Sequence, residues 1–151
     1  MKSCNLPRYS SSIGKMKAHI SFKVKYCHPI FLDENVKNKC KEVFLEVFEE
    51  LKVPVDEIGF DDNHVHFVFD VTPKYALWYI MKRLKGRSSR LLMQEFPYLK
   101  EKYFWGSHLW NPSYYFDSLG KNEEQMCSYV KNQPLNREQN KTQTNLVNWF
   151  N

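Results

Sequence analysis

Two short apolar runs separated by three polar residues constrain the fold more than any other feature of this sequence. The runs cover residues 55–60 and 64–71, and Asp61, Asp62 and Asn63 lie between them. Both runs are rich in β-branched and aromatic residues, which is typical of strands. Because the link is so short, the two strands can only form an antiparallel hairpin.

The residues before this hairpin predict a strand and then a helix. Residues 18–26 place apolar side chains at every second position, which indicates a half-buried strand. Residues 33–52 place them three or four positions apart, with Asp33 able to cap the first turn and Pro54 able to end the helix. A helix therefore connects the first strand to the hairpin.

The pattern after the hairpin predicts three further elements around a glycine. A helix is expected over 75–84, and Gly86 should interrupt it before a second short helix that begins at Ser88 or Ser89. Aromatic residues over 103–116 suggest extended pieces, and 123–133 suggests a last helix. The order is that of an α+β fold, and a ferredoxin-like antiparallel sheet with helices on one face fits it most simply.

Composition places the chain among ordinary globular proteins. Of its 151 residues 42% are hydrophobic, enough for a packed core, yet no apolar run approaches the roughly 18 residues of a membrane helix. The four cysteines contain no Cys-x-x-Cys pair, which favours a reducing cytoplasm over a disulfide framework. We expect a flexible arm over 1–17 without a secretory signal, one domain over 18–134, and a tail over 135–151.

Charge is unevenly distributed along the chain. The sequence has 22 Lys and Arg against 17 Asp and Glu, and ten of the acids lie between Asp33 and Asp62. A chain that is acidic in one segment and basic elsewhere can attract a polyanion to one face and repel it from another. This pattern favours an oriented nucleic-acid-binding protein, although scattered solvated charges would give the same net value.

Two histidines on one predicted strand form the first candidate site. Alternation puts His64 and His66 on the same face of the sheet, while Val65 points into the core. Two imidazoles so placed can hold one divalent ion, but a His-x-His pair is also common as a packed or surface pair. On the predicted last helix Tyr129 and Gln133 are four residues apart and share a face, an arrangement that is frequent by chance.

A basic stretch forms the second candidate site. It contains five cations and no acid around the expected helix break, so guanidinium groups and free backbone N–H groups could meet phosphates together, but a solvated helix face is as plausible. The five candidate DNA-binding residues are Lys82, Arg83, Lys85, Arg87 and Arg90. Nearby aromatic residues could stack on unpaired bases or belong to the core, namely Trp105, Trp110, Tyr114 and Tyr115.

Four segments in order carry a resemblance to a known family. They are Asn63-His64-Val65-His66-Phe67-Val68-Phe69, Leu84-Lys85-Gly86-Arg87-Ser88-Ser89-Arg90, Trp105-Gly106-Ser107-His108-Leu109-Trp110 and Tyr129-Val130-Lys131-Asn132-Gln133. Over roughly residues 18–134 the chain resembles the single-tyrosine HUH transposases, the small IS200-like enzymes of insertion sequences that move as single-stranded DNA. The family usually has an acid directly before the first histidine, where this chain has Asn63.

The resemblance implies a role for each matching residue. His64 and His66 match the two metal-binding histidines, Gln133 matches the residue that completes the metal site, and Tyr129 matches the nucleophile. The implied metal is Mg²⁺, with Mn²⁺ as a substitute. The implied reaction cleaves and rejoins single-stranded DNA through a 5′-phosphotyrosine.

The resemblance also implies partners. These are a DNA hairpin and a second copy of the chain, which forms a homodimer with composite active sites, in the cytoplasm and on the nucleoid, with no membrane. A domesticated relative that processes palindromic repeats would have the same residues, and a non-catalytic single-strand-binding module would keep only the aromatic and basic ones. A zinc hydrolase is disfavoured, because no further ligand follows His66 at a recognisable spacing.

Overall fold

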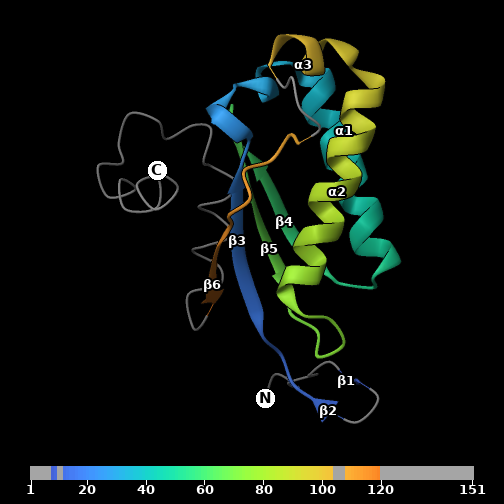
Figure 1. Cartoon of the computed structure of the whole chain (residues 1–151). Coiled ribbons are helices and arrows are strands. Elements are labelled where there is room, and N and C mark those ends of the chain that lie inside the picture. The colour runs from blue at the N-terminus through green and yellow to red at the C-terminus, as the bar shows by residue number, and fades with distance from the viewer. Residues whose placement is uncertain (1–7, 10–11, 104–107, 120–151) are drawn as a thin grey trace, which may run out of the picture.

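A four-stranded antiparallel sheet forms the centre of the molecule (Figure 1). The computed structural model describes residues 8–9, 12–103 and 108–119. The strands lie in the order β4, β5, β3, β6, and every neighbouring pair is antiparallel. Their bounds are β3 (Lys17–Lys23), β4 (Val55–Phe60), β5 (His64–Asp70) and β6 (Tyr115–Leu119).

The long helices α1 (Glu34–Glu50) and α2 (Leu77–Glu95) cover one face of this sheet, as Figure 1 shows. Asp33 caps α1 as predicted, since its carboxylate accepts a hydrogen bond from the backbone N–H of Asn35 at 2.9 Å. The succession of strand, helix, two strands, helix and strand confirms the predicted α+β fold with an antiparallel sheet. The predicted helix over 123–133 and the tail lie outside the described residues.

The core lies between the sheet and the two long helices. The inward face of the central strands is wholly apolar, with Phe22 and Phe67 buried beside Phe44 of α1. The first strand was expected to be half-buried, and that expectation is wrong. All seven residues of β3 are buried, because the strand is paired on both sides and its polar side chains pack against those of β5.

The predicted break at Gly86 is absent, and α2 runs through it as one helix. Glycine costs only about 1 kcal/mol relative to alanine inside a helix. Packing on both sides of it outweighs this cost, because Leu84 and Leu92 are fully buried. Ser88 caps no second helix. Its hydroxyl donates to the carbonyl of Leu84 at 2.6 Å and accepts from the indole N–H of Trp110 at 2.8 Å.

Short elements complete the described structure. Within the predicted arm, β1 (Arg8–Tyr9) pairs with β2 (Ser12–Ile13). After β3 the chain makes two single turns of 3₁₀ helix, η1 (Lys25–Cys27) and η2 (Ile30–Leu32). Helix α3 (Pro97–Lys102) was not predicted from the sequence. It begins with proline at its first position, where a backbone N–H would have no partner within the helix and its loss costs nothing.

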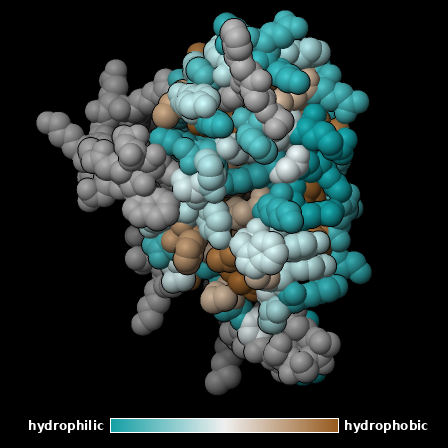
Figure 2. Space-filling model, viewed as in Figure 1, coloured by the Kyte–Doolittle hydropathy of each residue, from teal (hydrophilic) through white to brown (hydrophobic). Residues whose placement is uncertain are grey.

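The surface seen in Figure 2 is mainly hydrophilic, with apolar side chains emerging between β6 and the start of α2. There Met16, Leu77 and Phe116 line a cavity of about 320 Å³. Phe116 and Met16 are among the most exposed large apolar side chains. No helix in the described part of the chain is long and apolar enough to cross a membrane.

Candidate active site on the polar face of the sheet

The face of the sheet opposite the helices carries the candidate site. The pairing of β3 with β5 sets Ser21 opposite His66 and Lys23 opposite His64. Alternation along β5 therefore places both histidines on one face, as predicted, and Val65 in the core. We call this the polar face. It is defined by the side chains of Lys17, His19, Ser21, Lys23, His64 and His66.

The two predicted metal ligands are neighbours. The ring centroids of His64 and His66 are 4.7 Å apart, with the planes 72° from parallel. His64 is partly exposed, and its Nδ1 lies 2.7 Å from the side-chain oxygen of Asn63. That contact orients the ring and leaves Nε2 directed elsewhere, 3.8 Å from the Asp61 carboxylate. Both rings thus lie on the polar face, close enough together for a nitrogen of each to bind one ion.

His66 is buried, and only one of its two ring nitrogens has a hydrogen-bond partner among the described residues. Its Nδ1 lies 3.2 Å from Nε2 of His19 on β3, and the two rings are stacked with centroids 5.4 Å apart. Its Nε2 is buried and has no hydrogen-bond partner among the described residues. A buried ring nitrogen without a partner is costly unless it binds something. This atom is therefore the structural feature that best fits a metal ligand.

Burial keeps these histidines neutral, the form that binds a metal. Burial, together with the nearby His64 and His19, holds the pKa of His66 well below its usual value. Burial also lowers the pKa of His19, an effect that the Asp117 carboxylate partly opposes. Neutral imidazoles keep their lone pairs available for a divalent ion at neutral pH.

The remaining predicted residues of this site cannot be compared with the structure. Tyr129 and Gln133 lie outside the described residues. Within the part that is described, no group of three or more His, Cys, Asp or Glu side chains is placed to hold a metal ion. A metal site built on His64 and His66 therefore needs a further ligand.

Two residues beside the histidine pair were not predicted from the sequence. His19 lies at an outward position of the first strand, so the alternation that identified His64 and His66 also contained it. The contact with His66 was not visible because 47 positions separate the two residues. Asp61 was treated only as part of the turn, yet its carboxylate lies beside His64.

The predicted DNA-binding residues on α2 differ in what they contact. Arg83 and Arg87 both bind Glu50 of α1, and Arg87, with help from Arg83, holds the pKa of that carboxyl below its usual value. Lys82 and Arg90 are exposed. The expected free N–H groups at a helix break are absent, because α2 is continuous.

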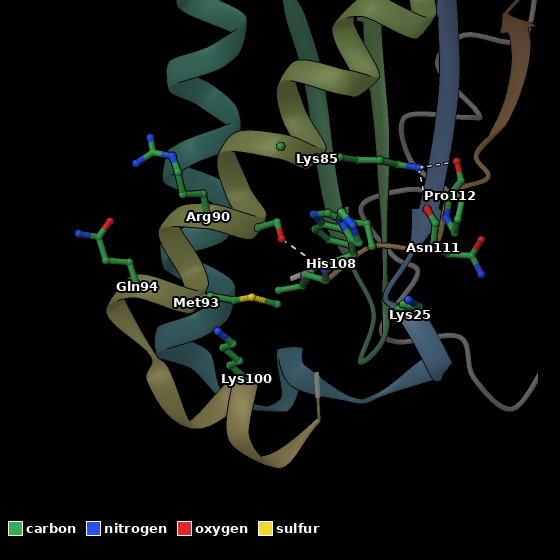
Figure 3. Close-up of a pocket in the computed structure, with 13 residues that line it drawn as sticks. Lys25, Lys85, Arg90, Met93, Gln94, Lys100, His108, Asn111 and Pro112 are labelled. Carbon is green, nitrogen blue, oxygen red and sulfur yellow. Dashed lines mark hydrogen bonds between the residues drawn. The ribbon is translucent and has the colours of Figure 1, made fainter. Parts of the chain in front are cut away.

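Lys85 has a structural task. Its ammonium group donates to the backbone carbonyls of Asn111 and Ser113, at 2.8 and 2.9 Å, and also to that of Pro112 at 3.3 Å. Burial lowers the pKa of Lys85 to about 8. The side chain fastens the segment after Trp110 to α2, as Figure 3 shows. Trp110 itself is buried, so it cannot stack on a base, and Trp105 lies outside the described residues.

A groove lies beside this contact (Figure 3). It has a volume of about 790 Å³ and is bounded by α2, α3 and the segment after residue 107. The side chains labelled in Figure 3 come from all three elements and, for Lys25, from η1.

Comparisons with known proteins agree on one family. The sequence profile described as "Transposase IS200 like" matches residues 12–133. The ISDra2 transposase TnpA of Deinococcus radiodurans is 32% identical over 122 residues, which are 80% of this chain and 86% of that protein. The transposase for insertion sequence element IS200 of Salmonella typhimurium is 32% identical over 117 residues, 78% of this chain and 76% of that protein.

Solved structures show the same fold. A crystal structure described as a transposase from Deinococcus radiodurans superposes with a TM-score of 0.69 at 27% identity, covering 85% of this chain and 98% of that one. A REP-associated tyrosine transposase bound to a REP hairpin superposes with a TM-score of 0.63 at 9% identity, covering 90% of this chain and 77% of that one. The profile match, the sequence identity and the fold together show that this chain belongs to the IS200-like transposase family.

Proposed function

We propose that this transposase cleaves and rejoins single-stranded DNA at the ends of an insertion sequence. The Tyr129 oxygen attacks the scissile phosphorus, forms a 5′-phosphotyrosine bond and releases a 3′-hydroxyl. A 3′-hydroxyl later attacks the same phosphorus and displaces the tyrosine, so the bond energy is kept and no nucleotide cofactor is needed. The proposal is supported by family membership and by the paired histidines on the polar face.

A divalent metal fits the histidine pair. His64, His66 and Gln133 would hold Mg²⁺, or Mn²⁺ in its place, and the ion would supply positive charge to the oxygens of the scissile phosphate. The observation that favours a metal is the buried Nε2 of His66, which has no partner among the described residues. Asp61, whose carboxylate is 3.8 Å from His64 Nε2, adds an oxygen donor at the same edge.

His19 is a positioning residue in this proposal. For His66 to bind a metal through Nε2, its proton must be on Nδ1, and that N–H then donates to Nε2 of His19 at 3.2 Å. Burial lowers the pKa of His19, so that its Nε2 stays free to accept this bond. The contact would thus hold His66 in the tautomer and orientation that leave its Nε2 for a metal.

We propose a DNA hairpin as the recognised substrate end. One structural neighbour is described as bound to a REP hairpin, and this chain belongs to the IS200-like transposase family. Among the predicted contacts, Lys82 and Arg90 are exposed on α2, whereas Arg83 and Arg87 are paired with Glu50. We expect Lys82 and Arg90 to contact phosphates most directly, and the other three predicted residues, Lys85, Arg83 and Arg87, to act mainly through the fold.

A homodimer with composite active sites remains part of the proposal. Strand β3 cannot provide a free edge for a second copy, because β5 and β6 pair with it on both sides. Among the described strands of this sheet β4 and β6 are the two edges, and Phe116 on β6 is 60% exposed. An apolar edge of this kind is suited to contact with another copy. Such a dimer would act in the cytoplasm, on the nucleoid.

The processing of dispersed palindromic repeats is the second candidate. Its support is the fold likeness to the REP-associated transposase, at 9% identity. The 32% identity to two insertion-sequence transposases favours the first candidate.

The covalent intermediate provides the decisive experiment. Labelled single-stranded oligonucleotides covering the DNA that flanks the gene are incubated with the full chain and Mg²⁺ or Mn²⁺, and products are separated on a denaturing gel. We expect a protein–DNA adduct that EDTA prevents and that Tyr129→Phe cannot form, although Tyr129→Phe still binds the DNA. Cleavage by Tyr129→Phe at the wild-type rate would refute the assignment of the nucleophile. Binding of flanking DNA without any adduct would favour the non-catalytic single-strand-binding module.

A further inference from the structure

The groove beside α2 gathers cations that no acid neutralises. Among the described residues that line it are Lys25, Lys85, Arg90 and Lys100, and none is Asp or Glu. Lys25, Arg90 and Lys100 form no ion pair within the described part of the chain. This contrasts with Arg83 and Arg87 of the same helix, which are both paired with Glu50. The groove therefore presents uncompensated positive charge.

The rest of the lining combines apolar side chains with the polar Ser89, Gln94, His108 and Asn111. Met93 of α2 points into it in Figure 3, and Leu109 and Pro112 contribute from the facing segment. The exposed imidazole of His108 lies at its centre in the same view. A cationic rim around an apolar floor suits a nucleotide strand, because phosphates are attracted to the rim and unpaired bases cover the floor. A fully paired duplex has no free base faces for such a floor.

Gly86 provides a second, independent indication. It lies on the groove side of α2, where a glycine costs about 1 kcal/mol relative to alanine. A Cβ added at Gly86 would meet no atom within 4 Å, so neither packing nor backbone geometry requires glycine there. A side chain at this position would instead project into the groove. The absence of a side chain keeps the groove open for an occupant.

The groove is connected to the histidine end of the sheet by a short path. The backbone N–H of Val24 donates to the carbonyl of Asn63, the residue before His64, at 2.8 Å. On its other side Val24 pairs with Trp110, and the N–H of Lys25 donates to the carbonyl of Leu109 at 2.8 Å. A strand that leaves the polar face around this end of the sheet therefore passes Lys25 and reaches the groove.

We propose that this groove binds a single-stranded segment of the DNA substrate next to the cleaved position. Lys25, Arg90 and Lys100 contact its phosphates, and Met93, Pro112 and His108 contact its bases. The site deepens the proposed function, on which the identity of the DNA rests, and it is separate from the histidine site. Its contacts are to the backbone and to base faces, so we expect little sequence preference.

The glycine allows a test that changes charge alone. Binding of fluorescein-labelled (dT)15 to the full chain is measured by anisotropy in EDTA, where no metal-dependent cleavage occurs. Gly86→Glu places an anion in the groove and should weaken binding at least tenfold. Gly86→Gln, of the same size but uncharged, should weaken binding clearly less than Gly86→Glu, because it obstructs the groove without repelling phosphates, and Gly86→Ala should bind nearly like wild type. Equal affinities of Gly86→Glu and Gly86→Gln would overturn the proposal.

Two double variants compare cations that line the groove with cations that are paired with Glu50. Arg90→Ala with Lys100→Ala should lower the slope of log affinity against log salt by roughly 1.4, from about 0.7 per phosphate contact on single strands. Arg83→Ala with Arg87→Ala removes the same charge from the side paired with Glu50 and should change the slope by less than half as much. Equal changes in both double variants would mean that general surface charge, and not the groove, binds the strand.

Further measurements locate the strand and separate the two proposals. Oligonucleotides with 4-thiothymidine should crosslink to peptides containing Met93 or His108, and crosslinks confined to other peptides would contradict the site. Blunt duplex DNA should lose much less affinity than (dT)15 in Gly86→Glu, and an equal loss for both would also contradict the groove. If wild type forms no adduct on flanking DNA but Gly86→Glu still loses (dT)15 binding, the groove stands and the proposed transposition chemistry fails. If wild type forms the adduct but Gly86→Glu binds (dT)15 as well as wild type does, the proposed chemistry stands and the groove is rejected.

Discussion

The two faces of the central strands differ in what burial costs them. On the helix-covered face Phe22 and Phe67 are fully buried in contact with other apolar rings. On the polar face His19 and His66 are almost as deeply buried, at 1% and 4% exposure, although both carry polar nitrogens. Burial of the aromatic rings stabilises the fold, whereas burial of an unpartnered imidazole nitrogen opposes it. The polar face thus lowers the stability of the fold but provides a nitrogen that can bind a ligand.

Lys17 shows how the same face can be satisfied when it has only a structural role. Its ammonium group binds the carboxylates of Asp56 and Asp70. Burial alone would lower the pKa of Lys17, but the hydrogen bonds and charges of those two carboxylates raise it. The cation is therefore fully compensated. His66, on the next strand, retains one nitrogen without a partner among the described residues, and this difference separates a structural polar cluster from a candidate binding site.

The largest expected effect is the loss of catalysis on the polar face. His66→Ala should abolish the metal-dependent protein–DNA adduct, because it removes the buried ligand nitrogen. Ser21→Ala is the matched control, since Ser21 lies directly opposite His66 in the β3–β5 register. The control should keep adduct formation within a fewfold of wild type on a denaturing gel. Full activity of His66→Ala would end the metal-ligand interpretation.

The next effect concerns stability and belongs to the apolar face. Phe67→Ala should lower the free energy of unfolding by about 3–5 kcal/mol, because it leaves a cavity among packed rings. Phe116→Ala, at a side chain that is 60% exposed, should change it by less than about 0.5 kcal/mol. Urea denaturation measures both. A small loss for Phe67→Ala would show that the core can collapse around the missing ring.

An intermediate effect tests the positioning role of His19. His19→Ala should weaken binding of Mn²⁺ about 10- to 100-fold, the usual range for a partner of a metal-ligating histidine. Isothermal titration calorimetry gives the affinity, and ¹⁵N spectra of the imidazoles report whether the Nδ1–H tautomer of His66 is lost. His19→Gln, which keeps an acceptor, should restore part of the affinity. If His19→Ala changes neither the tautomer of His66 nor the affinity for Mn²⁺, His19 has only a packing role.

The smallest expected effect is a pH dependence of the metal-free protein. The pKa values of His19 and His66 are lowered by burial in the folded chain from an ordinary value of 6.5. As the pH falls below about 6.5 the unfolded chain binds protons that the folded chain does not, so stability decreases. Urea denaturation between pH 7 and pH 5 measures this slope, and His19→Phe should reduce it. A wild-type stability that rises toward pH 5 would contradict it.

Much of the fold follows from local patterns. The hairpin of β4 and β5, the capped helix α1 and the common face of His64 and His66 were all predicted, because strand and helix periods are set by backbone geometry. Because successive side chains of a strand point to opposite faces of the sheet, the position of the apolar residues decides which side chains point away from the core. The candidate pair of histidines could therefore be identified without knowing what surrounds it.

The sequence by itself determined the succession of strand, helix, hairpin and helix, the face that carries the histidines and the motifs of the family. Only the tertiary structure decided that Gly86 lies within one helix, that Glu50 binds Arg83 and Arg87, and that His19 contacts His66. The last two outcomes depend on residues 33 to 47 positions apart in the chain. Local propensity amounts to about 1 kcal/mol per residue, and packing between distant segments readily exceeds it.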